Sequence, residues 1–204
     1  MTLLPEIMTQ PIALALWAVF GYLLGSVPFG LVMARLFGLG NLRDIGSGNI
    51  GATNVLRTGN KLAAFLTLIL DSGKGAIAVF VARSLAAEDA VQLAALAAFL
   101  GHCFPVYIGF KGGKGVATFL GVLLAISFPI GLAACGTWLV TAVITRISSL
   151  SALVAAGTSA LWAYGLGQPQ LAGLCIGLAV LIFYRHNANI NRIIAGTEPR
   201  IGKK

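Results

Sequence analysis

The chain alternates between long uncharged apolar stretches and short polar segments that carry glycine, asparagine and cations. The first stretch, residues 12–34, has no charged residue, and a helix of this length at about 1.5 Å per residue spans roughly 30 Å of hydrocarbon. It does not fit a signal peptide, because Glu6 and no Lys or Arg precedes it and because the run is too long. We expect a first membrane helix over residues 12–37, with Pro28 inside it. Further apolar stretches predict helices over residues 61–83, 90–108, 150–166 and 171–184, with an acidic turn at residues 88–89.

The uncharged stretch 116–144 is about 43 Å long as one straight helix, which is more than a single crossing needs. Basic segments near residues 43–61, 111–114 and 185–204 are expected to face the cytoplasm, so an even number of crossings must separate the last two. A break near Pro129 gives that even number, because a proline disfavours helix in the residue before it and removes a backbone donor. The sequence predicts an all-α integral membrane protein, a polytopic bundle of about seven transmembrane helices with its N-terminus outside and its C-terminus cytoplasmic. Five spans with re-entrant segments are the alternative.

Composition agrees with a membrane protein. Apolar residues make up 58% of the chain and charged residues 10%, against roughly a quarter charged in soluble domains. The net charge of +8 does not indicate a nucleic-acid partner, because the cations lie in short loops and in the C-terminal tail, where they act as orientation signals. The three cysteines are far apart in apolar stretches, so we expect no metal site and no cofactor. No internal repeat or linker is visible, and we expect a single domain over residues 1–204.

Three polar islands interrupt the apolar pattern. The first island is GSGNIGATN, residues 46–54, flanked by Arg43 and Arg57; the second is FKGGKG, residues 110–115; the third is YRHNANINR, residues 184–192. Glycine, serine, asparagine and cations together can hold a phosphate through backbone N–H groups and charge. The predicted topology brings all three islands and the turn 146–151 to the cytoplasmic face. The pattern indicates one phosphate-binding site there. It predicts no function for Ile50.

Familiar nucleotide motifs fail on these islands. Gly46, Gly48 and Gly51 fit the spacing of a dinucleotide-binding loop, but no strand precedes them. A Walker loop is excluded because Lys114 is followed by glycine and because position 108 is isoleucine. The alternatives are that the first island is a simple loop and that Lys111 and Lys114 only orient the chain in the membrane.

Other polar groups within the apolar stretches leave their roles open. Asp71 and Lys74 lie one turn apart on one helical face, as a structural pair or as part of a functional site. His102 is expected to form hydrogen bonds in the core. His186 lies within the third island, and Asn189 follows it at i+3 on the same face. No nucleophile elbow and no His-x4-Asp pair is present.

The strings RDIGSGNIGATNVLR, DSGKG, GHCFPVYIGFKGGKGVAT, RISSLSA and YRHNANINR resemble, in order, the motifs of the bacterial acyl-phosphate:glycerol-3-phosphate acyltransferase family, the PlsY type. The resemblance covers nearly the whole chain, residues 21–198. It implies a multi-pass enzyme of the bacterial inner (cytoplasmic) membrane with its active site on the cytoplasmic face. It further implies transfer of a fatty acyl group from long-chain acyl phosphate to the 1-hydroxyl of sn-glycerol 3-phosphate, giving lysophosphatidic acid and inorganic phosphate.

The resemblance also implies roles for named residues. Ser47 and Arg57 would bind substrate phosphate or polarise the acyl carbonyl, and Lys114 would neutralise charge on the leaving phosphate. His186 and Asn189 would hold glycerol 3-phosphate. The further substrate-binding candidates are Asn49, Asn54, Lys111, Gly113, Ser149 and Arg192. In RISSLSA, Ser148 and Ser151 are candidates for the same role as Ser149.

The resemblance implies no clear protein base, so a substrate phosphate would accept the hydroxyl proton. Catalysis would then rest on positioning and electrostatic stabilisation. Membrane lipid is the expected surrounding, and a monomer the expected state. The rival class is a transporter or channel for an organic phosphate. Transporters often have paired halves with interrupted helices, and the sequence shows no such halves.

Overall fold

The computed structural model describes residues 2–202, and every regular element in that range is helical. The α-helices are α1 (Pro11–Gly25), α2 (Phe29–Leu36), α3 (Ala52–Leu56), α4 (Lys61–Leu85), α5 (Glu88–Cys103), α6 (Val116–Ile126), α7 (Phe128–Thr145), α8 (Ser148–Gly165), α9 (Ala172–Arg185) and α10 (Asn187–Ile194). Short 3₁₀ turns are η1 (Leu42–Asp44), η2 (Val106–Ile108) and η3 (Pro169–Leu171).

Each apolar stretch that predicts a membrane helix is helical in the structure. Four of them are long and apolar enough to cross a membrane: Pro11–Leu36, Lys61–Leu85, Glu88–Ile108 and Phe128–Thr145. A fifth crossing is added if Pro169–Arg185 and Asn187–Ile194, which meet at 66°, count as one bent span. The predicted division of residues 116–144 is confirmed, because α6 ends at Ile126 and α7 begins at Phe128 with Pro129 in its first turn.

The first membrane segment is not the continuous helix predicted over residues 12–37. It breaks between α1 and α2, because Pro28 has no N–H to donate and holds a backbone conformation outside the helical region. The break leaves the carbonyl of Val27 without a helical partner, and Nζ of Lys74 donates a 2.8 Å hydrogen bond to it. A membrane helix tolerates such a break where neighbouring side chains satisfy the freed backbone groups.

The predicted acidic turn at residues 88–89 is also wrong, since both acids form the first turn of α5. Negative charge is favoured there by the positive end of the helix dipole. Asp89 accepts hydrogen bonds from the backbone N–H groups of Met8 and Thr9, and so holds the chain that leads into α1.

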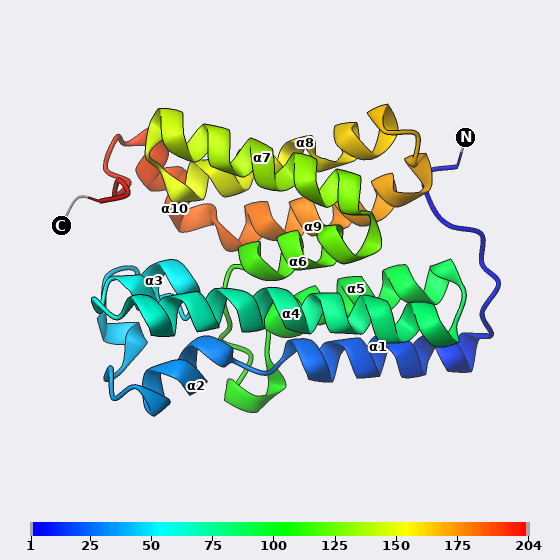
Figure 1. The fold of residues 1–204 in the computed structure, drawn as a ribbon, viewed down its shortest axis with the longest axis horizontal. Coiled ribbons are helices and arrows are strands. Elements are labelled where there is room, and N and C mark those ends of the chain that lie inside the picture. The colour runs from blue at the N-terminus through cyan, green and yellow to red at the C-terminus, as the bar shows by residue number, and fades with distance from the viewer. Residues whose placement is uncertain (1, 203–204) are drawn as a thin grey trace. The chain divides into compact units, whose positions relative to one another are not determined.

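The chain forms two compact units. In the N-terminal unit, residues 6–126, α4 packs on α1, α2, α3, α5 and α6, and α1 packs along α5 (Figure 1). Small residues allow close approach between α4 and α6: a Cβ on Gly121 would overlap the backbone of Ser72, and one on Gly75 would press on Val122. These contacts explain Gly75 and Gly121, whereas a Cβ on Gly73 would meet open space.

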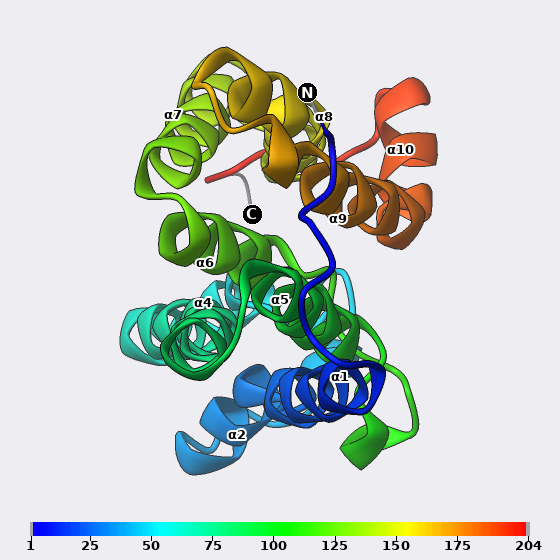
Figure 2. The same ribbon diagram turned by 90° about the vertical axis from the view of Figure 1, so that its right-hand side faces the viewer.

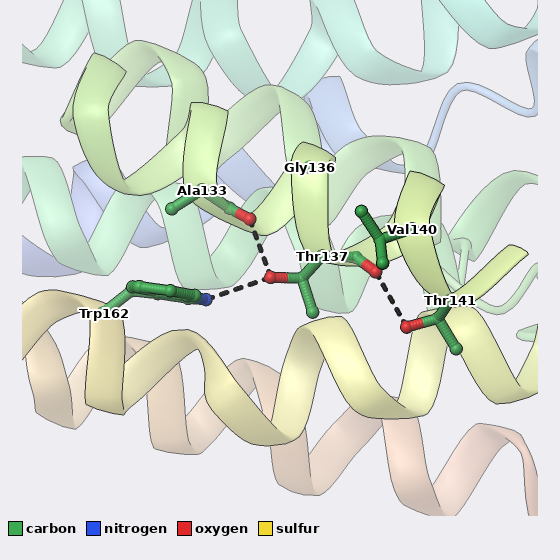
Figure 3. Close-up of a pocket in the computed structure, with 6 residues that line it drawn as sticks. All are labelled: Ala133, Gly136, Thr137, Val140, Thr141 and Trp162. Carbon is green, nitrogen blue, oxygen red and sulfur yellow. Dashed lines mark hydrogen bonds between the residues drawn. The ribbon is translucent and has the colours of Figure 1, made fainter. Parts of the chain in front are cut away.

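In the C-terminal unit, residues 2–5 and 127–202, α8 packs between α7 and α9, and α10 turns away from the axis of α9 (Figure 2). An open groove of about 380 Å³ lies along α7 and α8 (Figure 3). It is lined by Ala133, Gly136, Thr137, Val140, Thr141 and Trp162, and Trp162 donates to the hydroxyl of Thr137. The groove contains no charged side chain and none of the predicted site residues.

Candidate active site

The first island is organised around the buried amide of Asn54. Its Nδ2 donates to the carbonyl of Leu42 at 2.9 Å, and its Oδ1 accepts the backbone N–H of Ser47 at 3.2 Å. The Ser47 hydroxyl and Nη1 of Arg57 also reach Oδ1, each at 3.5 Å. The buried side chain of Asn54 therefore holds Ser47 and Arg57 together and stabilises the loop from the protein interior.

Ser47 and Arg57 are themselves exposed. Gly46 and Gly48 have φ values of 54° and 66°, which only glycine adopts without strain, and the turn they form presents the Ser47 hydroxyl at the surface. The Arg57 guanidinium lies directly over Gly46, where a Cβ would displace it. A hydroxyl and a guanidinium presented side by side can bind a phosphate or polarise a carbonyl.

Ile50, for which the sequence offers no function, anchors the island. Its side chain is buried, and its carbonyl oxygen lies so close to Gly30 of α2 that a Cβ there would overlap it. Asn49 is half-buried beside this anchor, with its amide near Gly51.

Arg43 links the first island to the second. Its Nη2 donates a 2.7 Å hydrogen bond to the carbonyl of Lys111. The second island then leads into α6, which begins two residues after Lys114, as the sequence predicts. Gly115 has a φ of 81° and lies against the ring of Phe99, so only glycine fits at this last position before the helix. The half-buried Lys114 is thus carried at the N-terminal end of α6, where the helix dipole favours an anion.

The third island is a bend between two helices. His186 ends α9 and starts α10, and its carbonyl accepts the N–H of Ile190. Its ring is buried, and Nδ1 lies 2.8 Å from the carbonyl of Ile182. Because a carbonyl oxygen can only accept, Nδ1 carries a proton and donates it to this carbonyl.

Glu198 joins the predicted site residues of the C-terminal unit. Its Oε1 accepts from the Ser149 hydroxyl and from Nδ2 of Asn189, and its Oε2 accepts from Nε of Arg192, all at 2.6 Å. Burial alone would raise the pKa of this carboxyl, but the three hydrogen bonds and the charge of Arg192 lower it below its ordinary 4.5. Ser151 is not equivalent to Ser149, because its hydroxyl donates to the carbonyl of Ile147 within its own helix.

Comparisons with known proteins identify the family of the chain. A model of the family described as glycerol-3-phosphate acyltransferase matches residues 15–196. The chain belongs to this family. A glycerol-3-phosphate acyltransferase of Jannaschia sp. (strain CCS1) is 68% identical over 98% of this chain and 99% of its own length. One from Cereibacter sphaeroides is 65% identical over 98% of this chain and 96% of its own length.

The fold of the chain is also similar to solved structures of a glycerol 3-phosphate acyltransferase. The chain is similar to PlsY (YgiH), an integral membrane glycerol 3-phosphate acyltransferase, in its glycerol 3-phosphate form, with a TM-score of 0.87 and 41% identity over 93% of this chain and 96% of that one. For the lysophosphatidic acid form the TM-score is 0.84, with 39% identity over 93% of this chain and 95% of that one. The chain is therefore an all-α integral membrane acyltransferase.

In this acyltransferase the predicted site residues fall into two groups, one in each unit. The N-terminal group comprises Ser47, Asn49, Asn54, Arg57, Lys111, Gly113 and Lys114. The C-terminal group comprises Ser149, His186, Asn189 and Arg192.

Sequence reasoning missed Glu198 as a member of the acyltransferase's C-terminal group. One signal was available, since Glu198 is the only acidic residue after Asp89 and lies in an otherwise basic tail. Within residues 2–202, no three His, Cys, Asp or Glu side chains gather in a way that could hold a metal ion. The chemistry on view is that of cations, hydroxyls and amides.

Proposed function

We propose that the chain transfers a fatty acyl group from a long-chain acyl phosphate to the 1-hydroxyl of sn-glycerol 3-phosphate. The carbonyl carbon forms an ester bond to the hydroxyl oxygen and its bond to the phosphate oxygen breaks, so the products are lysophosphatidic acid and inorganic phosphate. The observation that carries the proposal is the hydroxyl and guanidinium of the first island linked through Arg43 to the Lys-Gly-Gly-Lys loop. This is phosphate-binding chemistry in a chain similar to PlsY in its glycerol 3-phosphate form.

The N-terminal group acts on the activated acyl donor. Ser47 and Arg57 bind its phosphate or polarise its carbonyl, and Lys114 neutralises the charge that develops on the leaving phosphate. Lys111, Gly113 and Asn49 contribute further cation, N–H and amide groups to the same substrate. Because phosphate is a good leaving group, charge stabilisation and positioning suffice for the reaction.

The C-terminal group holds glycerol 3-phosphate, and both groups serve the same reaction. Nε of Arg192 donates to Glu198. The terminal N–H groups of the same guanidinium form the fork that binds phosphate. Ser149 and Asn189 are fixed by Glu198 at the same place, and Asn54 plays the matching supporting role in the N-terminal unit. The His186 ring orients the acceptor through Nε2, while a substrate phosphate takes the proton from the 1-hydroxyl.

The membrane arrangement that accompanies this proposal has about seven spans, with the N-terminus outside and the C-terminus cytoplasmic. The break at Ser127 supports it, because a turn there allows residues 116–144 to cross twice, as the basic segments require. Both groups of site residues then emerge at the cytoplasmic face of the bacterial inner membrane. We also propose that the enzyme acts as a monomer and as one catalytic domain. Relatives that match along nearly their whole length support the single domain.

The test is product formation by purified protein in detergent micelles. We expect radiolabelled glycerol 3-phosphate to become lysophosphatidic acid with acyl phosphate as donor, and not with acyl-CoA or acyl carrier protein. Failure to form lysophosphatidic acid with any donor would refute the enzyme assignment. A transporter of organic phosphate would instead show activity only in sealed vesicles, as counterflow of intact glycerol 3-phosphate.

A further inference from the structure

Three buried polar side chains of the N-terminal unit take no part in the proposed reaction. Lys74, Asp71 and His102 have side chains that are 1%, 3% and 4% exposed. Ionisable groups inside a membrane protein are costly, and they persist where they pair and serve a purpose. Their positions show what that purpose is.

The three side chains form one continuous line of polar contacts. Nζ of Lys74 lies 2.8 Å from the carbonyl of Val27 and 2.9 Å from Oδ1 of Asp71. That same carboxylate oxygen lies 3.5 Å from Nδ1 of His102. The line therefore starts at the break between α1 and α2, crosses α4 and ends on the imidazole at the end of α5.

The imidazole is in turn the surface on which the second island rests. The backbone N–H of Gly113 donates a 3.0 Å hydrogen bond to the carbonyl of His102. A Cβ on Gly113 would overlap Nε2 of the ring, so the loop backbone lies directly on the imidazole. A Cβ on Gly112 would instead overlap the backbone carbonyls of His102 and Cys103 and the ring of Pro105, and not the imidazole.

We propose that His102, held in place by the buried Asp71–Lys74 pair, is a positioning residue for the loop Lys111–Lys114. The inference rests on the proposed function, because the position of this loop sets where Lys114 meets the leaving phosphate. His102 touches no substrate. It acts through the backbone of Gly113, with the ring as the spacer and Asp71 as the group that fixes the ring.

A double-mutant cycle tests this contact. In the wild-type background, Gly113→Ala forces the ring away, and we expect kcat/KM for acyl phosphate to fall by about tenfold or more. His102→Asn removes the Nε2 end of the ring and keeps an amide that can face Asp71, so it makes room for the added methyl group. In the His102→Asn background, Gly113→Ala should cost about threefold or less.

Gly112→Ala is the matched control, since its methyl group meets backbone and should cost the same with or without His102→Asn. A second readout is Asp71→Asn, which should raise KM for acyl phosphate more than it lowers kcat. If His102→Asn does not fold, as judged by gel filtration in detergent, His102→Ala serves in the same cycle.

The outcomes separate the two claims. An inactive wild-type protein would refute the proposed function. An active wild type in which Gly113→Ala costs the same in both backgrounds would refute the positioning role of His102 and leave the reaction standing.

Discussion

The carboxylate of Glu198 accepts a 2.6 Å hydrogen bond from the hydroxyl of Ser149, which lies forty-nine positions earlier in the chain. Asn189 and Arg192 of α10 donate to the same carboxylate. One acidic side chain in the tail thereby fixes the N-terminal end of α8 against α10. Three residues of the C-terminal unit thus depend on a group that contacts no substrate in the proposed reaction.

Glu198→Gln is expected to lower both stability and activity. A glutamine offers one acceptor and one donor where the carboxylate offers two acceptors, so Nε of Arg192 loses its partner or faces an N–H group. We expect a loss of about 1–3 kcal/mol in the free energy of unfolding. Thermal unfolding of the two proteins in detergent at pH 7 measures it, and equal stability would contradict the role of Glu198.

The same pair of proteins gives a prediction about pH. The pKa of Glu198 is lowered in the folded state, so its contribution is complete above its ordinary pKa of 4.5 and is lost as the pH falls through the lower folded value. The stability difference between wild type and Glu198→Gln should therefore be constant from pH 7 to about pH 5 and shrink below pH 4.5. A difference that grows on acidification would contradict the sign of this shift.

Ser47→Ala and Lys114→Ala are expected to reduce turnover about a hundredfold or more while the protein stays folded. Ser47 is exposed and Lys114 is half-buried, so neither truncation opens a core cavity. The controls are Ser84→Ala and Lys61→Ala, which remove an exposed hydroxyl and an exposed cation from α4, a helix that carries none of the predicted site residues. Rates near normal for both site variants in a phosphate-release assay would remove the assignment of the N-terminal group.

Much of this architecture follows from the sequence. Apolar runs predict every long helix, and Pro129 predicts the break that separates α6 from α7. Pro28 is the instructive failure. A proline can sit inside a membrane helix when its neighbours satisfy the freed backbone groups. Here the helix breaks at Pro28, and Lys74 donates to the carbonyl of Val27 at the break.

The candidate site divides in the same way. Glycine, serine and cation strings identify the three islands, because their chemistry is local. The supporting groups are long-range, and the sequence gives no sign that Asn54 holds Ser47 from below or that Glu198 gathers Ser149 and Asn189. A sequence shows residues whose side-chain chemistry suits the ligand. It does not show residues whose role depends on tertiary contacts with distant parts of the chain.

Lys74→Met tests the structural role of the buried pair. The change leaves Asp71 without its cation and leaves the carbonyl of Val27 with only the backbone N–H of Phe29 as donor, so we expect a loss of about 3–5 kcal/mol in stability. The double variant Lys74→Met with Asp71→Asn should recover part of that loss, because no charge is left buried alone. Unfolding in detergent compares the wild type, the two single variants Lys74→Met and Asp71→Asn, and the double variant. Additive losses would show that the two side chains do not act as a pair.

The topology gives an independent prediction. In a background with Cys103, Cys135 and Cys175 replaced, Arg146→Cys should react with an impermeant thiol reagent only from the cytoplasmic side. Gln168→Cys, in the segment between α8 and α9, should react only from the outside. Labelling of position 146 from outside would contradict the seven-span arrangement and favour the five-span alternative.

The most direct test of the whole account is phosphorus NMR of one reaction that contains purified protein, acyl phosphate and glycerol 3-phosphate in micelles. We predict that the acyl phosphate and glycerol 3-phosphate signals decay together, while inorganic phosphate and lysophosphatidic acid grow at equal rates. Without glycerol 3-phosphate the acyl phosphate signal should persist. Phosphate released at the same rate with or without the acceptor, and without lysophosphatidic acid, would contradict acyl transfer.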